Sequence, residues 1–116
     1  MQAPLLNLIV IRASNPPELA EFYGNMGFEF QSERHGTGPE HLSSHVGGSV
    51  FEIYPRTPAS ADTTAVRLGF IVDSIARVLQ RLGSHADIVS APRISEWGTR
   101  CVLRDPEGHK VELLEA

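Results

Sequence analysis

The apolar residues of the chain first form a short unbroken run and then recur at helical spacing, which predicts a strand followed by a helix. The run is Leu-Ile-Val-Ile at residues 8–11, and its β-branched members favour a strand. Residues 14–18, Ser-Asn-Pro-Pro-Glu, combine candidate N-cap residues with first-turn prolines and an acidic third position. A helix is expected from there, with four apolar residues on one face and a glycine at its end: Leu19, Phe22, Tyr23, Met26 and Gly27.

Three strands and a linker are expected after this helix. The strand-like segments are residues 28–34, 40–46 and 49–54. They are separated by Gly-Thr-Gly-Pro at 36–39 and by a pair of glycines at 47–48, both typical of tight turns. The following residues, 55–64, are rich in Pro, Ser, Thr and Ala and predict an exposed linker.

The same order of elements is repeated in the second half of the chain. Residues 67–72 predict a strand and Asp73 is a candidate N-cap, followed by a second set of apolar residues at helical spacing and a glycine: Ile75, Val78, Leu79, Leu82 and Gly83. Three further strands are expected around residues 87–90, 100–104 and 110–114. The closing strands align most closely, with Gly-Ser-Val-Phe-Glu-Ile from residue 48 matching Gly-His-Lys-Val-Glu-Leu from residue 108. An internal duplication is the economical explanation, and a chance likeness between two α+β halves is the alternative.

The alternation of side chains along these strands predicts a polar sheet face opposite each helix. Each helix has one apolar stripe, so it covers one face of its sheet and leaves the other free. The residues that alternation assigns to the free faces include Glu52, Tyr54, Glu112, His35 and His41. The two glutamates lie at equivalent places in the two halves. Two such faces curled toward each other are expected to form a polar cleft that binds a ligand.

Composition and charge restrict the classes of function. The 116 residues are 41% hydrophobic, enough for one core, and the formal net charge is -4 without a basic cluster, so no nucleic acid partner is expected. The single cysteine, Cys101, favours a reducing compartment, and we expect it to be a buried apolar residue and not a nucleophile. No signal-peptide pattern or membrane-length apolar run is found, which predicts a cytoplasmic protein without a membrane partner.

Two motifs make the chain resemble the glyoxalase/bleomycin-resistance/dioxygenase superfamily, also called the vicinal oxygen chelate superfamily. They are the strand-turn-helix of residues 8–23 with Met-Gly-Phe at 26–28, and Asp-Pro-Glu-Gly-His-Lys-Val-Glu-Leu at 105–113. The resemblance covers essentially the whole chain. It implies an α+β fold in which two tandem βαβββ modules form a half-open mixed β-barrel with the helices outside, usually within a homodimer. The implied organisation is a single glyoxalase-like domain over residues 1–116, with module 1 at about 5–56, a linker at about 57–65 and module 2 at about 66–116.

The resemblance also implies a metal site, and this sequence departs from its pattern. Enzymes of the family hold one divalent metal with four side chains, one from the first strand and one from the last strand of each module. The last-strand positions correspond to Glu52 and Glu112, and the first-strand positions correspond to Leu8 and Arg67. Leucine has no ligand atom and a guanidinium has no acceptor, so the usual site is broken. We hypothesise that Arg67 stands in place of the metal and neutralises the two glutamates.

A second hypothesis keeps a divalent metal but moves it. Across the turn at residues 36–39, His35 and His41 could approach each other near Glu52 and form a two-histidine, one-carboxylate set of the kind that binds iron or zinc. The alternative is that both histidines flank a turn in solvent or hydrogen-bond a bound ligand. No nucleotide cofactor is expected.

Other residues are candidates for contact with a ligand. Arg12 shares a strand face with Leu8, and the resemblance implies that an arginine at this place holds an anionic substrate. Trp97 is the only tryptophan and lies in an expected loop, where it would form the wall of a ligand site or anchor an interface. Tyr54 and Arg100 are also placed near the expected cleft.

Two classes of function remain. The first is a glyoxalase-like lyase or isomerase that acts on a small oxygen-rich or anionic molecule, with Glu52 or Glu112 as the base. The second is a sequestering protein of the bleomycin-resistance type that needs no metal. Loss of two ligand positions favours the second class or an enzyme that works without a metal. In both classes we expect the ligand to contact Arg12, Arg67, Tyr54, Trp97 and His41.

Overall fold

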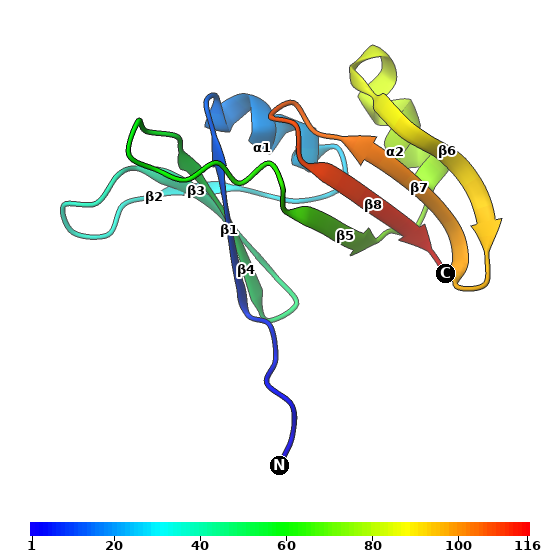
Figure 1. The fold of residues 1–116 in the computed structure, drawn as a ribbon, viewed down its shortest axis with the longest axis horizontal. Helices are drawn as coiled ribbons and strands as arrows, with labels where there is room; N and C mark the ends of the chain where they lie inside the picture. Colours follow the sequence, from blue (N-terminus) through cyan, green and yellow to red (C-terminus); the bar gives the residue numbers. More distant parts are fainter. The chain divides into compact units, whose positions relative to one another are not determined.

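The chain folds into two compact units of the same construction. The computed structural model describes residues 1–116, which divide into Met1–Ala61 and Asp62–Ala116. Each unit has one α-helix and one four-stranded sheet (Figure 1). The predicted pair of βαβββ modules is therefore confirmed. Neither helix is long and apolar enough to cross a membrane.

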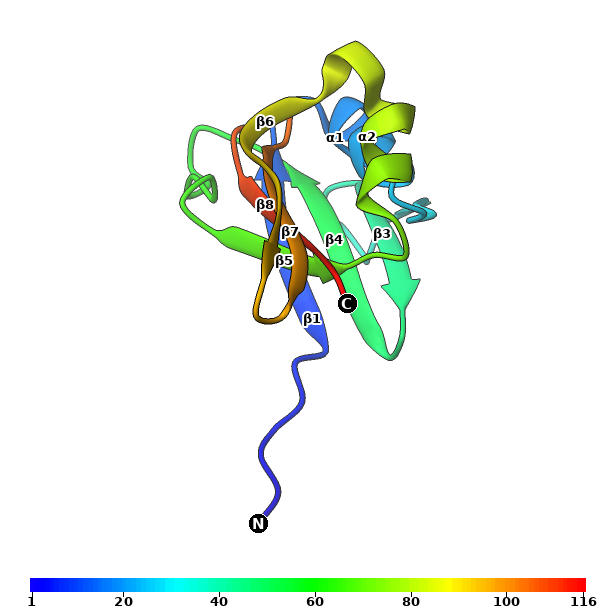
Figure 2. The ribbon, with the colours of Figure 1, turned by 90° about the vertical axis from the view of Figure 1, so that its right-hand side faces the viewer.

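The first unit begins with a strand and a helix and ends with three antiparallel strands. Its elements are β1 (Leu8–Ala13), α1 (Pro16–Gly24), β2 (Gln31–Glu33), β3 (His41–Val46) and β4 (Ser49–Pro55). The strand order is β1-β4-β3-β2, with β1 parallel to β4. Figure 2 shows β3 and β4 side by side up to the tight turn that joins them. This order brings side chains from four strands onto one sheet face.

The start of α1 follows from its capping residues, and its end differs from the prediction. The Asn15 side chain accepts a hydrogen bond from the Glu18 amide at 3.2 Å, and prolines occupy the first turn. The expectation that Met26 belongs to the helix is wrong, because α1 ends at Gly24. The chain then turns through Gly27, whose φ of +110° only glycine adopts without strain.

Aromatic rings fill the core of the first unit. Tyr23 of α1 packs edge-on against Phe51 of β4, with ring centroids 5.0 Å apart. The rings of Phe28 and Phe30 pack on the same Phe51 ring at 5.4 and 5.8 Å. Both residues enter the core before the ladder begins, so β2 is shorter than the predicted segment 28–34.

The second unit repeats the construction of the first. Its elements are β5 (Arg67–Ile71), α2 (Ile75–Leu82), the short 3₁₀ helix η1 (Gly83–His85), β6 (Asp87–Ser95), β7 (Gly98–Arg104) and β8 (Lys110–Glu115). The strand order is β5-β8-β7-β6, with β5 parallel to β8. β6 and β7 form a long curved hairpin (Figure 1), so β6 extends well beyond the predicted segment 87–90.

The N-cap of α2 is one residue later than predicted. Ser74, and not Asp73, accepts the capping hydrogen bond, from the Arg77 amide at 3.1 Å. Both residue types are good N-caps, so local preference could not separate them. The position of Ile75, Val78 and Leu82 in the core fixes where the helix begins.

A buried carboxylate organises the turn between β7 and β8. Asp105 Oδ1 accepts hydrogen bonds from the amides of Glu107, Gly108 and His109 at 2.9 to 3.0 Å. Asp105 also contacts His109 Nδ1 at 2.9 Å, and His109 Nε2 lies 2.8 Å from Thr63 Oγ1. The first residues of the motif at 105–113 therefore stabilise this turn. Its last residues belong to β8, which carries Glu112.

Candidate functional site

Strand register places Glu52 and Glu112 on equivalent sheet faces in the two units. In β4, Glu52 stands between Phe51 and Ile53, both of which are buried in the core. In β8, Glu112 stands between the buried Val111 and Leu113 in the same way. Because successive side chains of a strand point to opposite faces, both glutamates project away from the helix-covered core.

On the first unit, Glu52 is part of a cluster with His41, Glu33 and His35. The three strands that carry it are adjacent, since Glu33 pairs with His41 and Ser43 pairs with Glu52. His41 Nε2 lies 3.2 Å from Glu52 Oε2 and 4.0 Å from Glu33 Oε1. One ligand atom from each of the four residues falls within 4.8 Å of all the others.

The buried His41 is fixed on three sides. Its ring stacks on Tyr54, with centroids 4.1 Å apart and an interplanar angle of 8°, and the His35 ring lies 5.1 Å away. Its Nδ1 lies 3.2 Å from the Pro39 carbonyl, which can only accept a hydrogen bond. Nδ1 is therefore the donor to this carbonyl, and Nε2 faces the carboxylates of Glu52 and Glu33.

The sequence prediction of this cluster was incomplete. It brought together His35, His41 and Glu52, and it did not include Glu33. The signal for Glu33 is the alternation that assigns it to the free face, combined with the register of the hairpin that sets it opposite His41. That register depends on the length of the turn at residues 36–39 and is not visible from composition.

Arg12 lies on the same sheet face and is engaged with its neighbours. Its Nη1 donates a hydrogen bond to the Pro55 carbonyl at 3.2 Å. Its guanidinium carbon lies 5.1 Å from the centre of the Tyr54 ring, so it makes a cation–π contact. Tyr54 thus contacts both Arg12 and His41, so three of the predicted ligand contacts lie together.

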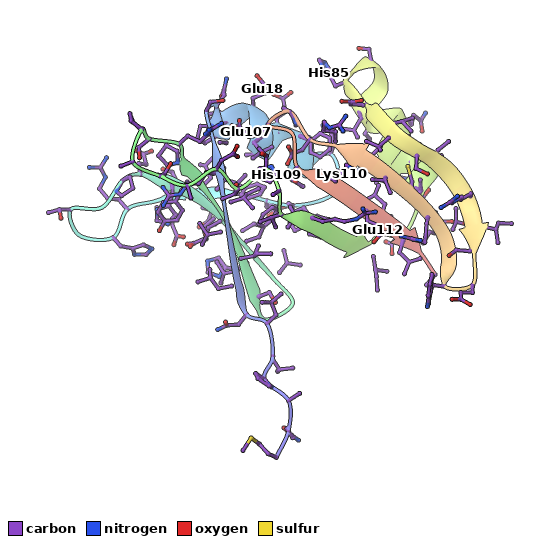
Figure 3. All side chains as sticks on the ribbon, in the orientation of Figure 1. Glu18, His85, Glu107, His109, Lys110 and Glu112 are labelled. Atoms are coloured by element: carbon purple, nitrogen blue, oxygen red, sulfur yellow. The ribbon has the colours of Figure 1, made fainter.

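On the second unit, Glu112 is paired with two arginines. Arg100 and Arg67 both form ion pairs with its Oε1, and the Arg67 contact measures 3.5 Å. Arg100 also lies over the ring of Trp97, with its guanidinium carbon 5.7 Å from the ring centre. Figure 3 shows Glu112 and Lys110 on β8, which carries both side chains on the same face.

Two cavities adjoin this arginine pair. The first, of about 180 Å³, is lined by four basic residues among others: Arg67, Arg93, Arg100 and Lys110. The second, of about 370 Å³, is lined by Trp97, Arg100, Glu112 and Leu114. Arg100 contributes to both cavities. Arg93 and Lys110 were not predicted as site residues. Arg93 stands directly opposite Arg100 in the β6–β7 ladder, which no pattern in the sequence indicates because β6 is bulged.

The residues at the positions where the resemblance implies metal ligands do not fit a metal. Leu8 offers no ligand atom, and Arg67 offers only donors. Glu112, which is the remaining partner of Arg67, is already neutralised by two guanidinium groups. A divalent ion at Glu112 would have to displace both arginines or be repelled by them.

A model of the Glyoxalase/Bleomycin resistance protein/Dioxygenase superfamily matches residues 5–113. The chain belongs to this family. A search of curated proteins finds no match to it. The family membership confirms the resemblance drawn from the two sequence motifs.

Solved structures of similar fold cover nearly the whole chain at low identity. TnmS3, an antibiotic binding protein from Streptomyces sp. CB03234, is 18% identical with a TM-score of 0.76, over 99% of this chain and 98% of its own. A glyoxalase/bleomycin resistance protein from the same source is 18% identical with a TM-score of 0.73, over 96% and 100%. TioX from Micromonospora sp. ML1 is 18% identical with a TM-score of 0.72, over 97% and 98%. These likenesses establish the glyoxalase-like fold of the chain.

Proposed function

We propose that this glyoxalase-family protein binds and sequesters a small molecule that carries an anionic group next to a planar, apolar part. The binding surface is the free sheet face of the second unit, where Arg67, Arg93, Arg100 and Trp97 lie. The observation that carries the proposal is the excess of positive charge in the cavity of about 180 Å³, which four basic residues line.

The pairing of like charges in this cavity favours an anionic ligand. Arg93 and Arg100 stand directly opposite each other on neighbouring strands, an arrangement that is unfavourable without a counter-charge. Glu112 supplies one carboxylate, and it already pairs with Arg67 and Arg100. A carboxylate or phosphate of the ligand would supply the missing negative charge and accept paired hydrogen bonds from the guanidinium groups.

The planar part of the ligand would bind in the second cavity. Its volume of about 370 Å³ lies within the usual range of small-molecule sites. Trp97 is 62% exposed at the edge of this cavity, and Leu114 contributes an apolar side chain. An aromatic or conjugated group packed on Trp97 would bury this surface while its anionic end reaches Arg100.

Sequestration is favoured over catalysis at this face because Glu112 is engaged as a counter-ion. A general base needs a carboxylate that is free to accept a proton, whereas Glu112 makes ion pairs with two arginines. The description of TnmS3 as an antibiotic binding protein supports a binding role for this fold. The lone cysteine further supports our proposal of a cytoplasmic location.

Fluorescence of the single tryptophan provides the test. We expect 4-nitrobenzoate to quench Trp97 with saturable binding, and the uncharged 4-nitrobenzamide to bind at least about tenfold more weakly, since a charge-assisted hydrogen bond contributes 1.5 to 3 kcal/mol. The Arg93→Gln variant should lose roughly tenfold in affinity for the nitrobenzoate. Arg104→Gln is the matched control, because Arg104 also lies on the β6–β7 hairpin but pairs with Asp87 and lines neither cavity. Equal binding of the two probes, or an unchanged affinity in Arg93→Gln, would contradict the proposal.

Glu52 supports a second candidate function, that of a glyoxalase-like lyase or isomerase. Its side chain is only 12% exposed, and its Oε2 lies 3.2 Å from His41 Nε2, so two groups that can exchange a proton are adjacent. As the base, Glu52 would remove a proton from the carbon next to a carbonyl group of the substrate. NMR should then detect uptake of deuterium from heavy water into dihydroxyacetone, and the rate of this uptake should fall by about 100-fold in Glu52→Gln. Exchange at the uncatalysed rate with the unaltered protein would exclude this candidate for that class of substrate.

A further inference from the structure

We propose that Glu33, His35, His41 and Glu52 form a binding site for a divalent transition-metal ion of the zinc type. All four residues belong to the first unit, on the strands β2, β3 and β4 and the turn between β2 and β3. The site goes beyond the proposed function, which rests on the second unit. It shares only Glu52 with the metal pattern of the family.

One distance between the ligand atoms already matches a tetrahedral site, and the others are longer. Zinc bonds of 2.0 to 2.2 Å to nitrogen and oxygen place neighbouring ligand atoms about 3.3 Å apart. His41 Nε2 and Glu52 Oε2 are separated by 3.2 Å, and Glu33 Oε1 lies 4.0 Å from the same nitrogen. All four ligand atoms lie within 4.8 Å of one another, so closing the set around one ion requires a movement of about 1 Å by the partly exposed Glu33 and the exposed His35.

The His41 ring is already oriented for metal binding, and its Nε2 makes no hydrogen bond that a metal ion would have to replace. The imidazole is 2% exposed, and its Nδ1 is bonded to the Pro39 carbonyl, the usual arrangement that orients a metal-binding histidine. Its buried Nε2 makes no hydrogen bond, although Glu52 Oε2 lies 3.2 Å away. The hydroxyl of the buried Ser43, which pairs with Glu52 across β3 and β4, also makes none. Two unpaired polar atoms on one sheet face are consistent with a site that takes a ligand.

Charge and ligand type select the class of ion. Two carboxylates neutralise a divalent cation, and without one they are held close together at an energetic cost. The two imidazoles disfavour calcium and magnesium, which prefer oxygen ligands only, and favour zinc, cobalt, nickel or iron. Tyr54 covers one face of the His41 ring and so helps to hold it in place.

The test uses Zn²⁺ and Co²⁺ on the full chain after dialysis against a chelator. We expect calorimetry to give one Zn²⁺ per chain, and Co²⁺ to give the visible absorption bands of a four-coordinate site. His35→Ala should lower the affinities for Zn²⁺ and Co²⁺ by about tenfold or more, and His41→Ala should lower them by about 100-fold or more. Even residues that only contact the ligands of a metal site contribute about 10- to 100-fold to its affinity. Magnesium at large excess should not displace Co²⁺.

His45→Ala is the matched control. His45 lies on β3 on the same sheet face, is exposed and is not part of the cluster. The His45→Ala variant should bind Zn²⁺ and Co²⁺ with the same affinity as the unaltered chain. His35 is itself exposed, so His35→Ala is expected to fold normally, and a urea unfolding curve checks this for each variant. Absence of stoichiometric binding, or equal affinity in His35→Ala, His45→Ala and the unaltered chain, would overturn the proposal and leave His41 as an ordinary partner of Glu52.

Discussion

Cys101 lies on β7 with its side chain in the core of the second unit. It is 1% exposed, and its ladder partner Leu113 is fully buried. Burial raises the pKa of the Cys101 thiol above its ordinary value of 9.0, because the thiolate is poorly solvated there. The expectation of a buried apolar cysteine is thereby confirmed.

The raised pKa makes stability depend on pH in the alkaline range. Below the ordinary pKa both the folded and the unfolded chain keep the thiol proton, so the contribution of Cys101 is fully present. As the pH rises above 9.0 the unfolded chain loses the proton first, and the free energy of unfolding falls by at most about 1.4 kcal/mol per pH unit. Urea unfolding at about pH 8 and about pH 10 should show a steeper alkaline loss for the unaltered chain than for Cys101→Ala. Equal losses in the two proteins would contradict this assignment.

At the scale of single residues, the sequence predicted what depends on alternation and missed what depends on register. Glu52 and Glu112 were assigned to the free faces because their neighbours in each strand are apolar. Glu33 and Arg93 were missed because each acquires its role from the residue opposite it, His41 and Arg100. Those pairings are set by turn length and by the bulges of β6, which composition does not reveal.

At the scale of elements, the beginning of α2 provides a sharp test of capping. Ser74 accepts the hydrogen bond from the Arg77 amide, whereas the exposed Asp73 precedes it outside the helix. Ser74→Ala should lower the free energy of unfolding by about 1 kcal/mol, because an amide of the first turn loses its partner. The matched Asp73→Ala change should have an effect within about 0.5 kcal/mol, as is usual for surface substitutions. Chemical unfolding of both variants measures the difference, and a larger loss in Asp73→Ala would contradict the observed cap.

All eight strands and both α-helices were predicted from the sequence, and the errors lie at their ends. Met26 has the spacing of a helical residue but lies past the end of α1, since the chain turns there to bring Phe28 onto Phe51. β6 continues to Ser95 although Pro92 interrupts its pattern. A proline is tolerated because β6 is the edge strand of its sheet, and the edge position is a tertiary property.

At the scale of the whole molecule, the repeat in the sequence predicted the organisation of the chain. The two sheets have the equivalent orders β1-β4-β3-β2 and β5-β8-β7-β6. The copies have nevertheless diverged in chemistry. The first carries histidines and carboxylates suited to a cation, and the second carries arginines suited to an anion. The positions that build each sheet are alike in the two units, whereas the side chains on the opposite face differ, which is why the fold was easier to predict than the site.

The predicted homodimer is the property of the whole molecule that most needs measurement. Ile71 is 77% exposed on β5, on the sheet face away from α2, and we choose it as the interface residue to test because a dimer formed through this face would bury its apolar side chain. We expect light scattering to give twice the chain mass of 12.7 kDa at micromolar concentration. Ile71→Glu should shift the protein toward the monomer, because the interface would then bury a charge. Gln80→Glu introduces the same charge on the exposed surface of α2 and should leave the mass unchanged. A mass of one chain for the unaltered protein at all concentrations would exclude the dimer, and a shift of equal size in both variants would place the interface elsewhere.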